Sequence, residues 1–272
     1  GGDWTKPLFP RYLATDAATT APEGSVRVMP LDLWDLQSVR DFAKAFLEEY
    51  PRLDILVNNA GIGSDPERQE TKQGENIVFG TNFIAHFLLT ALLLPRIKEA
   101  PAGRIVNLAS VTHHAASKDV LANFLPAPRS PYQDSKLAAI LHANHLRRND
   151  LQGTAVTAMA VNPGFVQSEI WRHKVSQPVI GPIFSSLMNF FALPNAQGCV
   201  TSVAAAIHQH APHVQYLSPY WVPNGCYLPF EISAPFLGAQ TAIPSLPPNE
   251  PEVSANLCQM STERVKAFAS PL

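Results

Sequence analysis

The chain has few cysteines and no excess of charge of either sign. Its three cysteines among 272 residues, Cys199, Cys226 and Cys258, are odd in number and far apart, which argues against a disulfide framework and a paired-cysteine metal site. The formal net charge is −2 and charged residues make up 15% of the chain, so it lacks a basic field for nucleic acid or an anionic membrane. We therefore expect no metal, no nucleic-acid partner and a reducing compartment, the cytoplasm.

Long apolar runs are also missing. The longest run, residues 83–95, is interrupted by His86 and Thr90 and is shorter than the roughly 20 apolar residues that a membrane-spanning helix needs. We predict a buried helix there and no transmembrane segment. The first residues contain no positively charged stretch followed by an apolar one, so we expect no secretory signal in the sequence as given.

Short apolar strands alternate with helices along most of the chain. We predict strands at 26–31, 54–58, 104–108, 155–161 and 226–230, and helices at 35–50, 73–98, 131–150, 195–210 and 255–269. The proline-rich stretches at 193–197, 217–224 and 234–253 are predicted to be loops. The alternation predicts an α/β fold with a doubly wound parallel sheet, in which ligands bind outside the carboxyl ends of the strands.

Tyr132 and Lys136 are four residues apart in the predicted helix 131–150. That spacing places the phenol and the ammonium on one face of a helix. A positive charge close to a phenol stabilises phenolate, so we expect the pKa of Tyr132 to fall from its usual value of about 10 toward neutrality. Such a tyrosine can act as a general acid or base in carbonyl and alcohol chemistry. The spacing by itself also occurs by chance on amphipathic helices.

Further motifs lie at the ends of predicted strands or at the start of the next helix. They are Leu31-Asp32-Leu33, Asn58-Asn59-Ala60-Gly61, Thr81-Asn82, Leu108-Ala109-Ser110 and Asn162-Pro163-Gly164. In this order, together with Tyr132 and Lys136, the chain resembles the short-chain dehydrogenase/reductase family. The stretch 81–95 and the long gap between Ser110 and Tyr132 are most similar to its retinol-dehydrogenase-like branch, and the resemblance covers roughly residues 26–230.

The resemblance implies four catalytic residues, Asn82, Ser110, Tyr132 and Lys136. Tyr132 would exchange a proton with the substrate oxygen, and Ser110 would orient that oxygen. Lys136 would bind the ribose hydroxyls of a nicotinamide cofactor, and Asn82 would hold a water that links Lys136 to solvent. Taken singly, Ser110 and Asn82 also fit ordinary helix caps.

The resemblance also implies cofactor-binding positions for NADP or NAD. Besides Tyr132 and Lys136, they are Asp32 at the adenine, Asn59, Ala60 and Gly61 along the adenosine ribose, Pro163, Gly164 and Val166 beside the nicotinamide, and Ser168. Ser168 replaces the threonine usual in the family and keeps its hydroxyl. Structural alternatives are a helix cap for Asp32, a turn for Gly61 and a bridge between strands for Asn58 and Asn59.

The opening unit of the family has no counterpart in the sequence. That unit is a strand, a turn of the form Thr-Gly-x-x-x-Gly-x-Gly, a helix and a second strand, and the first strand predicted here corresponds to the family's third. The Gly-rich turn normally binds the cofactor pyrophosphate through backbone N–H groups, and the second strand chooses between NAD and NADP. Without strands 1 and 2 we expect a hole in the sheet, unless its flanking strands pair directly or residues 1–25 fill it.

We therefore interpret the sequence as a dehydrogenase without its first βαβ unit, through truncation, an alternative start or an incomplete gene model. The expected regions are an irregular segment at 1–25, an incomplete Rossmann-like catalytic domain at 26–233, and a proline-rich loop with a C-terminal helix at 234–272.

Three functional hypotheses follow. The first is a nicotinamide-dependent oxidoreductase for a lipophilic alcohol, aldehyde or ketone, since apolar residues at 170–191 lie where the family has a substrate lid; a core helix or a subunit contact fits them equally well. The second is a non-catalytic scaffold that binds partners through helices 73–98 and 131–150, which the family uses for dimerisation, so a homodimer is a candidate assembly. The third is a defective product that does not persist as a folded monomer. His113 and His114 are expected at the surface or the site entrance.

Overall fold

The computed structural model describes residues 26–64, 67–117, 119–124, 131–166, 170, 192, 198–208, 215–219, 239–241, 244, 246–270 and 272. A five-stranded sheet runs through it in the order β1-β2-β3-β4-β5. The strands are β1 (Ile55–Asn58), β2 (Arg104–Leu108), β3 (Thr157–Val161), β4 (Tyr216–Pro219) and β5 (Ala239–Thr241). β1 to β4 are parallel, and β5 joins β4 in the antiparallel sense. This is the α/β fold that the alternation predicts.

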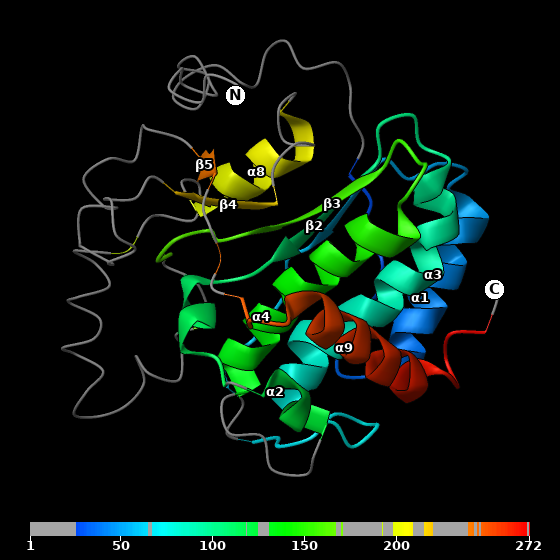
Figure 1. Cartoon of the computed structure of the whole chain (residues 1–272). Helices are drawn as coiled ribbons and strands as arrows, with labels where there is room; N and C mark the ends of the chain where they lie inside the picture. Colours follow the sequence, from blue (N-terminus) through cyan, green and yellow to red (C-terminus); the bar gives the residue numbers. More distant parts are fainter. Residues whose placement is uncertain are drawn as a thin grey trace.

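Helices cover both faces of the sheet (Figure 1). One face carries α1 (Leu36–Glu49), α3 (Ala85–Lys98) and α4 (Pro131–His145), and the other carries α8 (Val200–Ile207). α9 (Glu250–Val265) packs on α4, away from the sheet. The shorter elements are α2 (Ile77–Phe79), π-helical turns at Gly80–Ile84 and Leu146–Asp150, and 3₁₀ turns at Val111–Ala115 and Val120–Phe124.

α1 forms where the sequence predicts it, because its cap and its apolar face agree. The Oδ1 of Asp35 accepts a hydrogen bond of 3.0 Å from the backbone N–H of Gln37, which satisfies a donor in the first turn. Leu36, Val39 and Ala43 recur at helical spacing and are buried, and α1 packs against α3.

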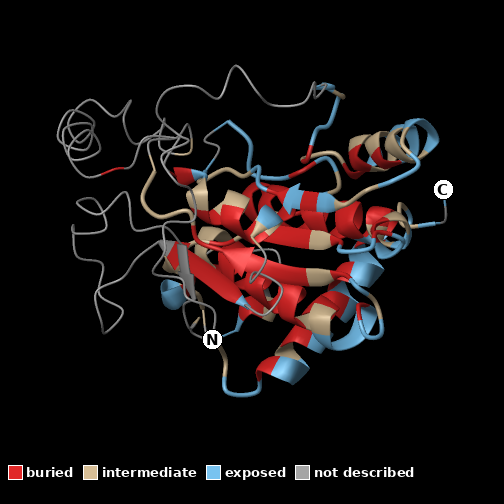
Figure 2. Ribbon diagram, turned by 90° about the horizontal axis from the view of Figure 1, so that it is seen from above, coloured by how far each residue is buried: buried red, intermediate tan, exposed pale blue. Residues whose placement is uncertain are grey.

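The helical run Ile77–Lys98 is 22 residues long, more than the apolar run in the sequence suggests. By length and composition alone it could cross a membrane, but 89% of its most apolar window is buried inside the protein. It is therefore a central helix of the core, as predicted. Figure 2 shows the same concentration of buried residues in the strands and in the helix faces that contact them.

A bidentate ion pair attaches α9 to the end of the α4 segment. The Nη1 and Nη2 atoms of Arg148 donate to the carboxylate of Glu250 at 2.7 and 2.6 Å, and Asn144 Nδ2 donates to the same carboxylate at 3.3 Å. Two parallel contacts fix orientation more strictly than one. α9 thus begins before the predicted start at 255.

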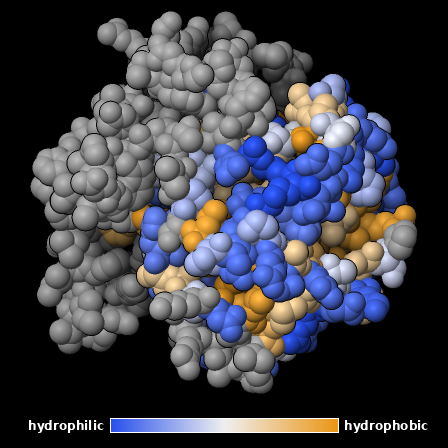
Figure 3. All heavy atoms as spheres, in the orientation of Figure 1, coloured by the Kyte–Doolittle hydropathy of each residue, from blue (hydrophilic) through white to orange (hydrophobic). Residues whose placement is uncertain are grey.

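The described surface is mainly hydrophilic, with separate apolar patches (Figure 3).

The predicted strand at 26–31 is wrong. These residues form no strand, Val26 and Val28 are 93% and 88% exposed, and none of the strand pairings includes them. An apolar stretch becomes a strand only where a neighbouring strand accepts its hydrogen bonds, and no described residue offers that here.

The expected hole in the sheet is also wrong. β1 lies at the edge of the sheet, paired with β2 on one side, and no described strand pairs with its other side. Ile55 and Val57 point to the same face of β1 and are 37% and 40% exposed. Among the described strands, β1 is therefore an edge strand, and the sheet from β1 to β5 has no internal gap.

Two stretches predicted as loops contain strands. β4 begins just before the stretch 217–224, and β5 lies within 234–253. β4 is a short buried strand: Tyr216, Leu217 and Ser218 are all buried, and Ala160 of β3 pairs with Tyr216. The prolines in this stretch favour a loop in a prediction from sequence. The predicted strand at 226–230 lies outside the described residues.

Candidate active site

Tyr132 and Lys136 lie near the start of α4, which packs against β2 and β3. The Nζ atom of Lys136 lies 5.6 Å from the centroid of the Tyr132 ring, as expected for a four-residue spacing on a helix. The Lys136 side chain is buried, and its Nζ donates to the carbonyl oxygen of Leu108 at 3.0 Å. The structure thus brings the two side chains together at the carboxyl end of β2.

The expected fall in the pKa of Tyr132 is not found. Burial raises the pKa of the phenol above its usual value, against the opposite effect of a hydrogen bond with the Ser110 side chain. Burial also lowers the pKa of Lys136 to about 8. The ammonium lies over the ring and donates to Leu108, and loss of hydration is the larger effect on the pKa of the phenol.

Ser110 follows β2 and begins the 3₁₀ turn Val111–Ala115. Its Oγ accepts a hydrogen bond of 3.3 Å from the backbone N–H of Thr112 and also hydrogen-bonds Tyr132. The residue therefore caps a turn and faces the candidate acid at once. The Nδ1 atom of His113 lies 2.6 Å from the Ser110 carbonyl oxygen, and His113 is buried, which corrects its predicted surface position.

Asn82 lies inside the π-helical turn Gly80–Ile84, and the N-cap of this helical run is Asn76. The side chain of Asn82 pairs with the backbone of Ile62: Oδ1 accepts from N–H at 2.8 Å, and Nδ2 donates to the carbonyl oxygen at 2.9 Å. Nδ2 also donates to Ser135 Oγ at 3.2 Å. Asn82 is therefore no ordinary helix cap, because it joins the loop after β1 to α4.

Gly61 lies directly against this group. A Cβ atom at position 61 would come within 3.0 Å of Asn82 Oδ1 and 3.6 Å of Lys136 Nζ. The absence of a side chain thus lets the loop approach the protein's own site residues. The preceding Asn59 and Ala60 are exposed at the end of β1.

The hydrogen bonds of Asp32 are with other residues, Trp34 and Ser38. It is exposed, and its Oδ1 accepts a hydrogen bond of 3.2 Å from the backbone N–H of Trp34, which is a local turn contact. Asp35, not Asp32, caps α1.

The segment after β3 forms a tight turn. Gly164 has a φ angle of +86°, in the left-handed region that favours glycine, and its N–H donates to Asn162 Oδ1 at 3.2 Å. Asn162 is fully buried and also donates from Nδ2 to Ser218 Oγ at 3.1 Å. Pro163 and Val166 are half-buried beside this turn, whereas Ser168 lies outside the described residues.

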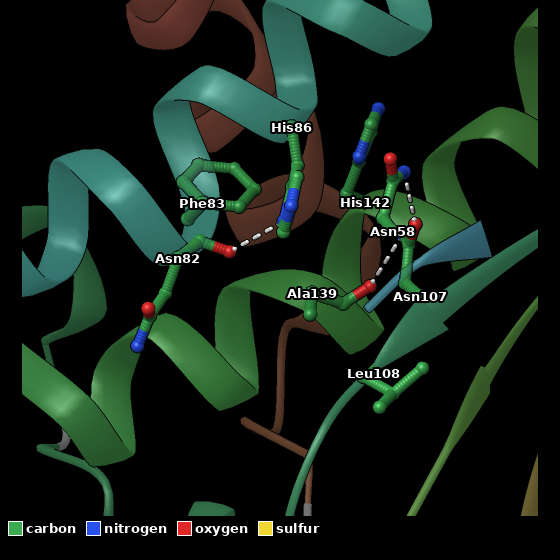
Figure 4. Close-up of a pocket in the computed structure, with 8 residues that line it drawn as sticks. All are labelled: Asn58, Asn82, Phe83, His86, Asn107, Leu108, Ala139 and His142. Atoms are coloured by element: carbon green, nitrogen blue, oxygen red, sulfur yellow. Dashed lines mark hydrogen bonds between the residues drawn. The ribbon is translucent and has the colours of Figure 1, made fainter. Parts of the chain in front are cut away.

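A buried polar network was not among the predicted site residues. Asn58 Nδ2 donates to Asn107 Oδ1 at 2.9 Å, and Asn107 Nδ2 donates to the carbonyl oxygen of Ala139 at 3.1 Å (Figure 4). Asn58 Nδ2 also donates to Thr90 Oγ1 at 2.9 Å. Asn58 therefore bridges β1 and β2, as its structural alternative predicts, and also reaches α3.

Two buried histidines complete this region. His86 and His142 line a small cavity of about 10 Å³ together with Asn58, Asn82 and Asn107 (Figure 4). Burial lowers the pKa of His86 to about 4 and that of His142 to about 3, so both are neutral at pH 7. The signal that could have found His86 is its place in a polar series, residues 82, 86 and 90, on one face of an otherwise apolar helix.

Comparison with known proteins identifies the family to which this chain is similar. A family model described as short chain dehydrogenase matches residues 11–178. The chain is 39% identical over 197 residues to retinol dehydrogenase 12 of Mus musculus, which covers 71% of this chain and 60% of that protein. It is 38% identical over 198 residues to retinol dehydrogenase 11 of Homo sapiens, covering 72% and 60%. The match thus spans 60% of the length of these curated relatives.

Solved structures agree on the fold. An uncharacterized protein from Mycobacterium Paratuberculosis superposes with a TM-score of 0.63 at 26% sequence identity, covering 89% of this chain and 76% of that one. The Pseudomonas aeruginosa RhlG/NADP complex superposes with a TM-score of 0.53 at 23% identity, covering 70% and 73%. At that identity the second likeness concerns the fold alone.

Proposed function

Because the chain belongs to the short-chain dehydrogenase family, in its retinol-dehydrogenase-like branch, we propose that it is a nicotinamide-dependent oxidoreductase for a lipophilic alcohol, aldehyde or ketone. The observation that carries the proposal is the hydrogen bond between Tyr132 and Ser110 beside the buried ammonium of Lys136. A structural scaffold has no evident need for a phenol, a hydroxyl and an ammonium gathered at the carboxyl end of a strand.

In the reductive direction, Tyr132 gives its phenolic proton to the carbonyl oxygen of the substrate, and Ser110 Oγ orients that oxygen through a hydrogen bond. The raised pKa of Tyr132 keeps the phenol protonated at neutral pH, which suits proton donation. Lys136, with a pKa of about 8, is mostly charged at pH 7 and stabilises the phenolate that is left. In the oxidative direction the same phenolate takes the proton back.

The donors around Lys136 fit one part of a nicotinamide dinucleotide. Nζ carries three N–H groups, one of which donates to Leu108, and no described residue accepts from the other two. These N–H groups match the ribose hydroxyls, and Pro163, Gly164 and Val166 would line the nicotinamide side. When bound, the dinucleotide supplies or accepts the hydride.

The pyrophosphate of such a cofactor has no matching cradle in the sequence given. No Gly-rich turn of the family type leads into a helix, and exposed Asp32, Asn59 and Ala60 remain for the adenosine end. The second candidate function is a scaffold that binds partners without catalysis, and measured affinity for the dinucleotide distinguishes the two.

The substrate class follows from the apolar residues at 170–191 and from relatives named retinol dehydrogenase. Most of this segment lies outside the described residues, so the lipophilic substrate rests on composition and kinship.

Titration of the purified chain with NADH and NADPH, followed by nicotinamide fluorescence, tests the cofactor half of the proposal. We expect saturable binding of one of them, and turnover with a series of lipophilic aldehydes. Binding of neither by a folded, monodisperse chain would refute the oxidoreductase function for this chain and support the scaffold.

Replacing Tyr132 tests the chemical half. Tyr132→Phe removes the transferable proton, so we expect kcat to fall by a factor of at least about 100 with the thermal midpoint little changed. Tyr50→Phe, at a surface tyrosine that donates to Glu49 at 3.0 Å, is the matched control and should leave kcat unchanged. Undiminished turnover in Tyr132→Phe would refute the assignment of the acid.

A further inference from the structure

His86 contacts the backbone of a candidate catalytic residue, Asn82. Its Nδ1 lies 3.1 Å from the backbone carbonyl oxygen of Asn82, four residues earlier in the same helix (Figure 4). A carbonyl oxygen only accepts hydrogen bonds, so Nδ1 must carry the hydrogen. The buried imidazole is neutral, which fixes its tautomer as Nδ1–H.

The contact between His86 and Asn82 lies where the helix backbone is irregular. Asn82 lies in the π-helical turn Gly80–Ile84, where the N–H of Ala85 donates to the carbonyl oxygen of Gly80, five residues back. Single π-helical turns are rare and are often found at functional sites. The imidazole of His86 ties the next turn of the helix back onto this one.

From Asn82 a series of hydrogen bonds reaches the helix that carries the candidate acid. Asn82 Nδ2 donates to Ser135 Oγ at 3.2 Å, and Ser135 Oγ donates to the carbonyl oxygen of Tyr132 at 2.7 Å. On its other side, Asn82 holds the backbone of Ile62. A shift in the turn at Asn82 would therefore move the start of α4 and the loop after β1 together.

We propose that His86 is a positioning residue of the site: its Nδ1–H holds the Asn82 carbonyl, and through Asn82 and Ser135 it sets the place of Tyr132. The imidazole touches no substrate atom in this role. The inference rests on the proposed function for its catalytic meaning, whereas the hydrogen-bonded series is a property of the folded chain without ligands.

Two amide substitutions separate this role from simple filling of the core. His86→Asn places an N–H donor near the position of Nδ1, and so it keeps the contact with the Asn82 carbonyl. His86→Gln is closer in length to histidine but places its amide one bond further out, near the position of Nε2. If His86 only fills space, His86→Asn is the worse variant, because it enlarges the cavity that His86 lines. If His86 positions Asn82, His86→Gln is the worse one.

Hydrogen exchange of the Ile62 amide reads the position of Asn82 directly, because that N–H donates to Asn82 Oδ1. We expect it to exchange about five- to tenfold faster in His86→Gln than in the unmodified chain, and within about twofold of it in His86→Asn, after correction for the global stability given by the amides of β2. Equal changes at Ile62 in both variants, once corrected, would overturn the proposal.

A second measurement uses the unmodified chain and therefore does not depend on whether a variant folds. Nitrogen-15 NMR of the imidazole at pH 7 should show His86 neutral with the hydrogen on Nδ1, and an Nε2–H tautomer would overturn the proposal. Where the unmodified chain turns over substrate, kcat should fall about tenfold in His86→Gln, with KM nearly constant, and recover in His86→Asn. An unmodified chain without turnover counts against the proposed function only, and the exchange and NMR results still decide the role of His86.

Discussion

Acidification should unfold this protein well above the pH at which carboxylates titrate. Three histidines are buried and neutral: His86, His113 and His142 are 8%, 2% and 4% exposed. Burial lowers the pKa values of His86 and His113 to about 4 and that of His142 to about 3, against 6.5 for an unburied imidazole. On unfolding, each imidazole becomes free to take up a proton.

The sign and size of the effect follow from this difference. Between pH 6.5 and the folded pKa values the unfolded chain binds more protons, so stability rises with pH and is lost as the pH falls from 6.5 toward 4. The free energy of unfolding changes by about 1.4 kcal/mol per pH unit for each such group. At pH 5 each histidine therefore lowers it by about 2 kcal/mol, and the three together by about 6 kcal/mol. A domain of this kind has about 5–15 kcal/mol in total. We therefore expect unfolding to begin near pH 5.

Urea unfolding at pH 7 and pH 5, followed by circular dichroism, measures the loss. The variant His142→Phe removes one titrating group at a place already lined by the rings of Phe83 and Phe87, at centroid distances of 6.1 and 4.9 Å. Its loss between the two pH values should be about 2 kcal/mol smaller. His145→Gln is the comparison variant: burial also lowers the pKa of His145, but Asp150 opposes this effect, so its replacement should reduce the loss by less than His142→Phe does. An equal loss in His142→Phe and the unmodified chain would refute the reasoning.

Two further predictions concern the loop after β1 and the strand β1 itself. Gly61→Ala places a Cβ atom 3.0 Å from Asn82 Oδ1, so we expect a loss of about 1–3 kcal/mol in urea unfolding and weaker nicotinamide binding; unchanged values would contradict the close contact. Val57→Lys puts a charge on β1, the edge strand of the described sheet, and should reduce concentration-dependent association in sedimentation velocity. Ile207→Lys, at an exposed helix residue, should not, and equal effects would show that β1 is not responsible.

The fold was predictable wherever local pattern and tertiary environment agree. β2 occupies the predicted residues, and α1 begins at its predicted cap. The prediction at 26–31 is wrong because a short apolar stretch shows what a strand could bury, but not whether a neighbouring strand is present. β4 was hidden for the opposite reason, since proline density masks a short strand that β3 pairs with and buries.

For the site, spacing placed Tyr132 and Lys136 side by side, but it could not give the sign of the change in the pKa of Tyr132. That sign depends on burial: the phenol loses more hydration than its hydrogen bond with Ser110 restores, although Lys136 lies over the ring at 5.6 Å. The polar series 82, 86 and 90 marks His86 as unusual, but the partners of His86 and His113 are backbone carbonyls, which the sequence pattern does not identify.

The two halves of such a site depend on different elements. The residues for proton transfer depend on α4, β2 and the turn at Asn82, and these elements hold one another through contacts that need no ligand and no open edge. The cofactor pyrophosphate depends instead on backbone N–H groups of a Gly-rich turn, in a unit that would pair beyond β1. The catalytic geometry can therefore persist where cofactor affinity does not, so an intact Tyr132 and Lys136 is evidence of lineage, and only the affinity for NADH or NADPH decides between an enzyme and a scaffold.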